Sequence, residues 1–251
     1  MKQIVILLFH SSLFIGCAMA QPLMRDVFAA MPDSVLPMVT KNNRLDCIDF
    51  IENNMEAKVR NVADEYVTLE ALTKDYARFR TSTAAVMEMK LLPVDTLTSH
   101  LSPFASHLLC LVTTAQTGEP NTPRRLEDSN IRFLRPDWMP LDSIYTGQVL
   151  FSMPPVSVFL THGNVATIGI SDSPGNAVSP ESSDKSSFDQ ALRSLEDFHP
   201  VRLALSPDTT TLTATLQPAY LAVEERKAVA TRLRPLTFRW NGSTFVVSAH
   251  E

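Results

Sequence analysis

The alternation of apolar and polar residues across residues 66–114 constrains the fold of this chain more than any other feature. In the first run, Val67 and Leu69 alternate with Thr68 and Glu70. A period of two residues is typical of a β-strand, whose successive side chains point to opposite faces of a sheet. Two similar runs follow, over residues 84–92 and 106–116.

These runs lie too close together in the chain for helical crossovers between them, so the strands should form an antiparallel meander. In the second run, Met87, Met89 and Leu91 alternate with Glu88 and Lys90. Such a strand predicts a sheet with one face on a core and a polar face that is free for a partner.

The segments before and after this meander predict shorter elements. A helix is expected over residues 44–52, where Leu45, Ile48 and Ile51 form an apolar stripe. Residues 117–128 are polar and contain glycine and proline, which predicts an exposed loop. Further on, short strands are expected at Ile131 and Phe133, and then at Val156, Val158 and Leu160.

The last third of the chain again predicts a helix followed by antiparallel strands. Ser187 and Gln190 have the spacing of a capping box at the start of a helix that Pro200 ends. Residues 201–216 alternate around a turn at Pro207-Asp208, and residues 221–234 predict a helix. A final hairpin is expected around Asn241-Gly242.

The predicted fold class is therefore α+β, with antiparallel β-meander sheets each flanked by helices in two similar lobes. The first lobe comprises residues 21–140 and the second residues 184–251. Between them, residues 141–183 predict an irregular connection with short strands, rich in serine, proline and glycine toward its end.

The first twenty residues predict a signal peptide. Lys2 supplies a positive charge, an apolar stretch follows, and Ala18-Met19-Ala20 is a small-x-small cleavage signal. The apolar stretch is shorter than the ~20 residues needed to span a bilayer, and no later segment is longer. We therefore expect a periplasmic or secreted protein with no transmembrane segment in the mature chain.

The cysteines leave two alternatives open. Cys17 follows Phe14-Ile15-Gly16, which resembles a lipobox, so an outer-membrane lipoprotein acylated at Cys17 is the alternative to cleavage after Ala20. Cys47 and Cys110 could pair as a disulfide in an oxidising compartment, or remain as two buried thiols.

Several segments of the chain carry a resemblance to known proteins. They include Met24-Arg25-Asp26-Val27-Phe28, Leu205-Ser206-Pro207-Asp208 and Leu236-Thr237-Phe238-Arg239-Trp240-Asn241-Gly242. These segments resemble a family of uncharacterised secreted proteins of Bacteroidales. The resemblance extends over nearly all of the mature chain, and it implies a location in the cell envelope without implying an activity, cofactor or catalytic residue.

The same resemblance makes one modification relevant, because some Bacteroidales envelope proteins carry O-glycans at Asp followed by Ser or Thr and a small apolar residue or Thr. Four sites fit this pattern. Asp-Ser and Asp-Thr pairs also begin turns and cap helices, which is the alternative explanation. The four acceptor residues are Ser34, Thr96, Ser143 and Thr209.

No motif in the sequence predicts a catalytic, cofactor-binding or metal-binding residue. A formal net charge of −5, with Arg124-Arg125 as its most basic point, argues against nucleic acid as a partner. Seven glycines against seventeen prolines disfavour a glycine-rich phosphate loop. The histidines of the expected mature chain are scattered, without the spacing of metal ligands. His100 and His107 could meet across a turn, and the alternative is two unrelated surface or core histidines.

We therefore predict an envelope protein of unknown biochemical function that is a non-enzymatic binding or interaction protein. Its sheets would present a face or edge to an envelope protein, a peptide or a polysaccharide. One alternative is a hydrolase with a dispersed His/Asp/Ser site. The other is an assembly factor that is tethered by lipid at Cys17.

Overall fold

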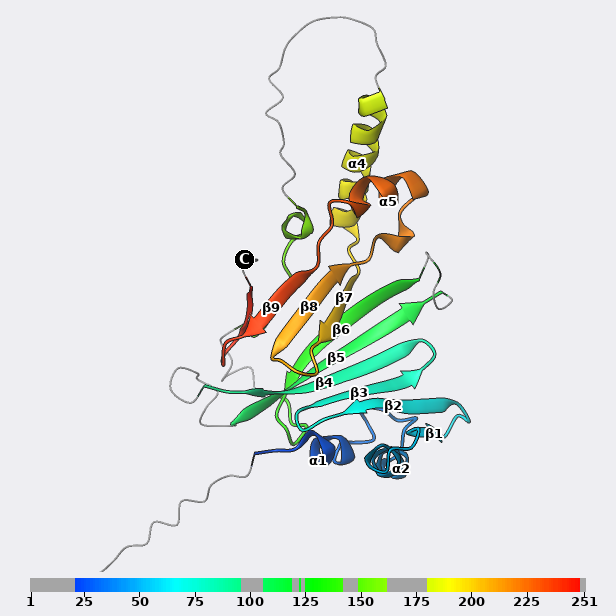
Figure 1. Ribbon diagram of the computed structural model, residues 1–251, viewed down its shortest axis with the longest axis vertical. Coiled ribbons are helices and arrows are strands. Elements are labelled where there is room, and N and C mark those ends of the chain that lie inside the picture. Colours follow the sequence, from blue (N-terminus) through cyan, green and yellow to red (C-terminus); the bar gives the residue numbers. More distant parts are fainter. Residues whose placement is uncertain are drawn as a thin grey trace, which may run out of the picture.

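The computed structural model describes residues 21–95, 106–118, 122, 125–141, 149–161 and 180–248, with the backbone alone for residues 180–185. Two antiparallel sheets and their helices form an α+β fold, which confirms the predicted class. Figure 1 shows the helices α1 and α2 below the larger sheet, the smaller sheet above it, and the helices α4 and α5 at the far end.

The larger sheet is a meander of six strands whose order in space follows the chain. The alternating runs in the sequence are confirmed as the strands Tyr66–Leu72, Ala85–Pro93 and His107–Thr117. Leu126–Leu134 begins within the predicted loop 117–128, so that part of the loop prediction is wrong. Its edge strand at Lys58–Arg60 was not predicted. The strands are β1 (Lys58–Arg60), β2 (Tyr66–Leu72), β3 (Tyr76–Ser82), β4 (Ala85–Pro93), β5 (His107–Thr117) and β6 (Leu126–Leu134).

Helices α1 (Met24–Ala29) and α2 (Lys41–Glu52) cover one face of this sheet. Helix α2 begins three residues before the prediction because Thr40 caps it. Its hydroxyl accepts from the Asn43 amide at 3.3 Å, and the Asn43 side chain accepts from the Thr40 amide at 3.1 Å. The core beneath the helices is apolar, with Phe28 and Phe79 edge to face at 5.2 Å.

The smaller sheet has four strands in the order β10-β9-β8-β7. The predicted hairpins are present, and the last one has a four-residue loop, because Trp240 pairs with Phe245. Gly242 adopts a φ of +97°, and the Asn241 side chain accepts from the Ser243 and Thr244 amides at 2.9 Å. The strands are β7 (Val201–Leu205), β8 (Thr211–Leu216), β9 (Leu236–Trp240) and β10 (Phe245–Val247).

The remaining elements correct two predictions. Helix α4 (Pro180–Asp197) already begins at Pro180, a residue favoured in the first helical turn, so Ser187 lies inside the helix and does not cap it. The expected strand at residues 156–160 is the 3₁₀-helix η1 (Val156–Phe159), whose spacing of three buries Val156 and Phe159 together. A second 3₁₀-helix, η2 (Pro218–Tyr220), precedes helix α5 (Val223–Ala230).

The smaller sheet lies on the polar face of the larger one and covers part of it. Strand β7 passes over β6, β5 and β4, and one apolar core contains residues of both sheets, such as Val112 and Leu203. Phe133 of β6 stacks on Trp240 of β9 at 6.4 Å. The expectation of a wholly free polar face is therefore wrong: the chain covers that face above β4 to β6 with its own second sheet.

Candidate functional site

The charged residues of β4 are buried where the two sheets meet, although their alternation predicted an exposed face. Only 5% of the Glu88 side chain is exposed. Its carboxylate accepts from the Tyr76 hydroxyl at 2.8 Å, from Arg78 at 2.7 Å and from the Leu205 amide at 3.4 Å. Lys90 donates to the Pro207 carbonyl at 2.8 Å and pairs with Asp75 at 2.9 Å. Each of these buried charges thus has protein partners.

Side chains of the larger sheet also satisfy the free edge of β7. The amides of Val201 and Leu203 donate to the Asp128 carboxylate at 3.2 Å and the Ser129 hydroxyl at 2.9 Å, in addition to the Leu205 bond to Glu88. A strand edge normally presents such groups to solvent or to another chain. Here the edge is occupied from within the molecule.

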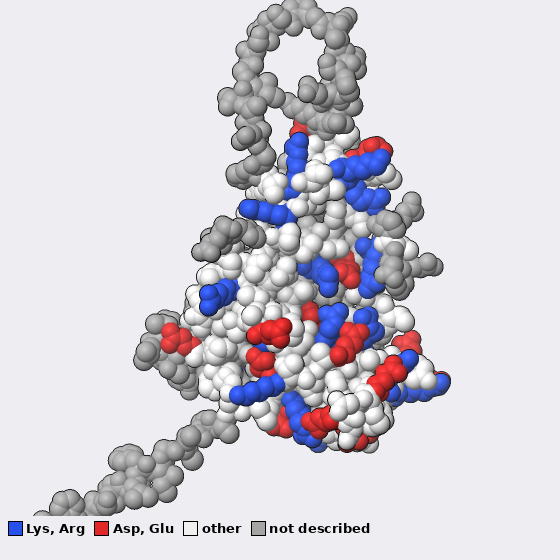
Figure 2. Space-filling model, in the orientation of Figure 1, with Lys and Arg blue, Asp and Glu red and all other residues white. Residues whose placement is uncertain are grey.

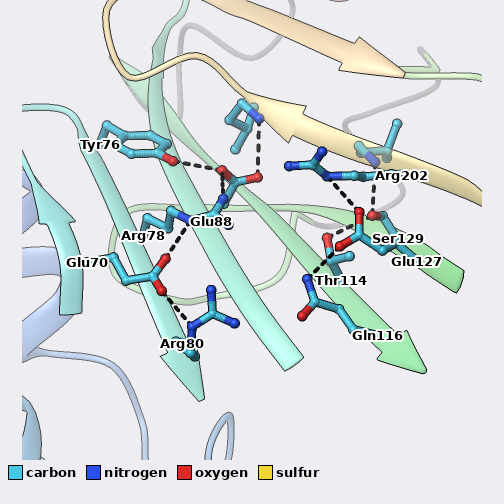
Figure 3. A network of polar contacts seen from close by, with 12 residues as sticks. Glu70, Tyr76, Arg78, Arg80, Glu88, Thr114, Gln116, Glu127, Ser129 and Arg202 are labelled. Atoms are coloured by element: carbon cyan, nitrogen blue, oxygen red, sulfur yellow. Dashed lines mark hydrogen bonds and ion pairs between the residues drawn. The ribbon is translucent and has the colours of Figure 1, made fainter. Parts of the chain in front are cut away.

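An open hollow begins where this cover ends. It has a volume of about 360 Å³ and lies between β3, the β5–β6 hairpin and β7, as the polar side chains in Figure 3 show. We call it the arginine hollow. It is lined by Arg78, Arg80, Arg125 and Arg202, with Gln116, Glu127 and Gln217.

Two glutamates hold the arginines of the hollow in place. Glu70 of β2 accepts from the Nε atoms of Arg78 at 2.7 Å and Arg80 at 2.6 Å. Glu127 of β6 lies 3.1 Å from the Nε atom of Arg202 and accepts from Gln116 at 2.8 Å. Carboxylates placed in this way fix the direction of a guanidinium group.

Arg80 and Arg202 keep their outer nitrogens unoccupied. Among the described residues, neither side chain has a hydrogen-bond partner for its Nη atoms, and both are partly exposed, at 34% and 43%. Arg125 differs, because its Nη2 atom donates to Gln116, while its Nε atom lies 3.2 Å from Glu127 without hydrogen-bond geometry. The hollow therefore contains two fixed guanidinium groups with donors to spare.

The charge states at the hollow follow from these pairs. Partial burial raises the pKa of Glu70, but the hydrogen bonds and charges of Arg78 and Arg80 outweigh burial and leave that pKa below its usual value. Burial lowers the pKa of Arg78, but the bonds and charges of Glu70 and Glu88 outweigh it and raise the pKa. Glu70 and Arg78 are therefore both charged near neutral pH.

The lining of the hollow fits recognition of anions. Guanidinium groups bind carboxylates and phosphates through paired hydrogen bonds, and the lining contains four arginines against one glutamate. Its seven lining residues include no serine, cysteine or histidine that could act as a nucleophile or base. Over the described ranges, no group of three or more His, Cys, Asp or Glu residues is placed to hold a metal ion.

A second hollow, of about 440 Å³, lies between η2 and α5. A single segment, residues 219–226, supplies its lining. Its one charged group, Arg226, already donates to the Ala219 carbonyl at 3.4 Å. This hollow therefore has fewer polar groups that could bind a ligand than the arginine hollow, whose lining residues come from five strands or their flanks.

The structure does not bring Cys47 and Cys110 together. Both are free thiols, and they belong to different cores, Cys47 beneath the helices and Cys110 between the two sheets. Burial raises the pKa of Cys47 to about 11, and burial also raises the pKa of Cys110. Both thiols are therefore protonated and poorly reactive near neutral pH.

The predicted modification sites are described only in part. Ser34 and Thr209 lie exposed in turns, and the Thr209 hydroxyl bonds to the Thr211 hydroxyl at 2.7 Å. Cys17, Thr96 and Ser143 lie outside the described residues. Lipidation and glycosylation both stay predictions.

The histidines lie away from the arginine hollow as far as they are described. His107 contacts Ser106 at 3.1 Å and Gln21 at 3.2 Å, and burial, with Lys74 nearby, lowers its pKa. His199 is exposed, while His100 lies outside the described residues, so its predicted meeting with His107 stays a prediction.

The sequence contains one weak signal for the arginine hollow. Arg78 and Arg80 flank Phe79 in a strand, which predicts that both point away from the core. Arg125 belongs to the basic pair in the polar loop, but nothing local indicates that it lies near β3. Arg202 is more than 120 positions from Arg80, and only the crossing of β7 brings it to the site.

Together, these features define a class: an α+β protein of two stacked antiparallel sheets with a polar, arginine-lined hollow at their junction. None of the described helices combines the length and apolar character that crossing a membrane requires. The chain belongs to the family described as "Protein of unknown function (DUF3256)", whose model matches residues 17–172.

One solved structure is similar in fold. It is described as "Structure of a domain of an uncharacterized protein from Porphyromonas gingivalis W83" and is 24% identical, with a TM-score of 0.61. The match covers 90% of this chain and 98% of that one. The resemblance to uncharacterised Bacteroidales proteins is confirmed in this coarser form, as a domain of unknown function with a structural neighbour from that group. No curated protein matches the chain.

Proposed function

We propose that the protein is a non-enzymatic binding protein that takes the anionic groups of a ligand into the arginine hollow. One observation carries this proposal: Arg80 and Arg202 are held through Nε, while their Nη atoms have no partner among the described residues. An arginine that serves only an internal ion pair has no need to leave these donors open.

Pre-positioning by Glu70 and Glu127 favours binding. Each carboxylate fixes a guanidinium before a ligand arrives, so less side-chain freedom is lost on binding. The local charge also favours an anion, because the four arginines of the lining outnumber the three carboxylates paired with them, Glu70, Glu88 and Glu127, on a chain whose net charge is −5.

Isothermal titration of the full chain with citrate tests this proposal. Citrate carries several carboxylates and little apolar surface, and we expect a dissociation constant on the order of 1 mM at low salt. Arg80→Gln and Arg202→Gln should each weaken binding about tenfold, the equivalent of one charge-assisted hydrogen-bonded contact.

Arg239→Gln is the matched control. Arg239 is exposed on β9, between two residues that point into the core. Its replacement by glutamine removes the same charge at a position away from the hollow. Equal losses in Arg80→Gln and Arg239→Gln would show a diffuse charge effect and contradict the proposal. Failure of the unmodified chain to bind citrate at low salt would also contradict it.

We also propose that the protein acts outside the inner membrane. Lys2, the apolar stretch after it and Ala18-Met19-Ala20 support export followed by cleavage. Mass spectrometry of the mature N-terminus should find Gln21 as the first residue. An acylated Cys17 would instead support the lipid-tethered alternative, and an intact Met1 in a cytosolic fraction would exclude export.

A further inference from the structure

We propose that the ligand is an acidic polysaccharide, bound as an extended chain from the arginine hollow across β3 and β2 to the sheet edge at β1. This inference rests on the proposed function and adds the class of the ligand and its direction on the sheet. The part of the face that β7 leaves uncovered carries it.

The strand register aligns the residues of this path. Lys58 of β1 lies opposite Thr68 of β2, and Thr68 lies opposite Arg80 of β3. Opposed residues on neighbouring strands point to the same face, so these side chains form one row. Two strand spacings separate Lys58 from Arg80, or about 10 Å along the row.

The β1 end of the row is positively charged, as the hollow is, and it lies at an open edge of the sheet. Tyr66 is 51% exposed, and the Lys58 ammonium and the Arg60 guanidinium lie 4.5 and 5.0 Å from its ring centroid. Arg60 is paired with Asp64, but Lys58 has no carboxylate partner among the described residues. β1 is one of the two edge strands of the larger sheet, so a chain could continue past it into solvent.

The polar character of the path selects among anionic ligands. All seven side chains that line the hollow are arginine, glutamine or glutamate, and Thr68 presents a hydroxyl group in the row beyond it. A peptide is usually held by apolar or aromatic side chains that enter pockets, and this lining has no apolar side chain. Single-stranded nucleic acid requires stacking on aromatic faces, and the one aromatic residue of the path, Tyr66, already has two cations on its ring. The arginines, glutamines and Thr68 of the path offer hydrogen-bond partners to carboxylates and hydroxyls along an extended chain, and an acidic saccharide carries both groups.

Galacturonate oligomers of increasing length are the probe for this inference. The full chain should bind longer oligomers more tightly until the oligomer spans from the hollow to β1, and binding should then level off. Lys58→Gln should weaken the binding of long oligomers about three- to tenfold and leave citrate binding unchanged, because one exposed charge contact is lost at the far end. Arg80→Gln should weaken the binding of both probes.

Lys41→Gln is the control for Lys58→Gln, because Lys41 is an exposed residue of α2, on the opposite side of the larger sheet. Circular dichroism on each variant should show unchanged melting, since all substituted side chains are exposed or partly exposed. Figure 2 shows that basic side chains also occur at the end of the molecule near β1 and β2. The comparison with Lys41→Gln therefore distinguishes a specific contact of Lys58 from a general electrostatic attraction.

Three outcomes would overturn the inference. If citrate binds and galacturonate oligomers of all lengths bind equally well, the path to β1 is wrong while the proposed function stands. If poly-glutamate binds more tightly than galacturonate of equal charge, the ligand class is wrong and an acidic peptide is favoured. If Lys41→Gln weakens long-oligomer binding as much as Lys58→Gln does, the row has no special role.

Discussion

Two halves of one sheet face differ in what lies above them. On the covered half, over β4, Glu88 and Lys90 contact groups of β7 and of the turn after it, 117 positions away in the chain. On the open half, over β2 and β3, Glu70 pairs with Arg78 and Arg80, and these two arginines line the hollow. Both halves have alternating charged residues, but Arg80 of the open half has no partner for its Nη donors among the described residues.

The difference separates two uses of the same residue types. A buried charge loses its hydration, so it is tolerated only where hydrogen bonds and opposite charges replace water. The covered half meets this condition and fixes where β7 crosses the larger sheet. The open half retains contact with water, where an ion pair adds little stability and can serve instead to orient a guanidinium group.

The largest effect on stability should come from the covered half. Glu88→Ala removes the acceptor for the Tyr76 hydroxyl, for Arg78 and for the Leu205 amide. Because buried partners are left unpaired, we expect a loss of about 3 kcal/mol in the free energy of unfolding. Urea denaturation followed by circular dichroism measures it. A loss as small as that of an exposed ion pair would show that β7 does not depend on Glu88.

Lys90→Met should have the next largest effect, because it keeps the aliphatic stem and removes the charge. The Pro207 carbonyl loses its donor. Asp75 loses its cationic partner, but it still accepts from the Thr73 hydroxyl and, at 38% exposed, can be hydrated. We expect a loss of about 2 kcal/mol by the same urea measurement. Lys227→Met, which breaks an exposed pair with Glu224, is the control and should change stability by less than about 1 kcal/mol. If the two variants lose equal stability, the buried charge of Lys90 contributes no more to stability than an exposed ion pair does.

Ser129→Ala tests the edge of β7 directly and should have a smaller effect. The Ser129 hydroxyl accepts from the Leu203 amide at 2.9 Å and bonds to Thr114 at 2.8 Å. We expect a loss of about 1 kcal/mol and faster hydrogen exchange at the Leu203 amide. Ser243→Ala in the last hairpin loop should leave that amide unchanged. Unaltered exchange at Leu203 in Ser129→Ala would mean that the edge is satisfied in another way.

The sequence predicts the strands of both sheets well because alternation is a local property. It does not predict β1, since three residues with one buried side chain, Val59, give too short a pattern. The start of β6 was missed for a different reason. Glu127, Asp128 and Ser129 have the composition of a loop, but they pair with β5 as a strand, and their side chains contact Arg202, Val201 and Leu203 of β7.

The candidate site was less predictable than the fold, because it depends on the crossing of two sheets. Arg78 and Arg80 could be assigned to one face from their spacing. Whether Glu88 or Glu70 on that face would be exposed could not be decided, since the covering strand lies more than 100 residues later. Alternation shows that a face is polar, but it does not show what covers that face.

The smallest predicted effect lies in the open half and concerns the pH dependence of stability. The pKa of Glu70 in the folded protein is lowered, on balance, by Arg78 and Arg80. The unfolded state therefore binds the proton more readily, so the stability from this pair is present above the ordinary pKa of a glutamate and is lost as the pH falls through the lowered folded value.

Glu70→Gln removes this dependence, so its stability should decline less than that of the unmodified chain between about pH 5 and pH 3. The two chains should differ by no more than about 1 kcal/mol near neutral pH, because the pairs are partly exposed. Urea denaturation at several pH values measures the difference. Parallel pH profiles would show that Glu70 does not hold Arg80 in solution, and the open half would then resemble an ordinary hydrated surface rather than a prepared site.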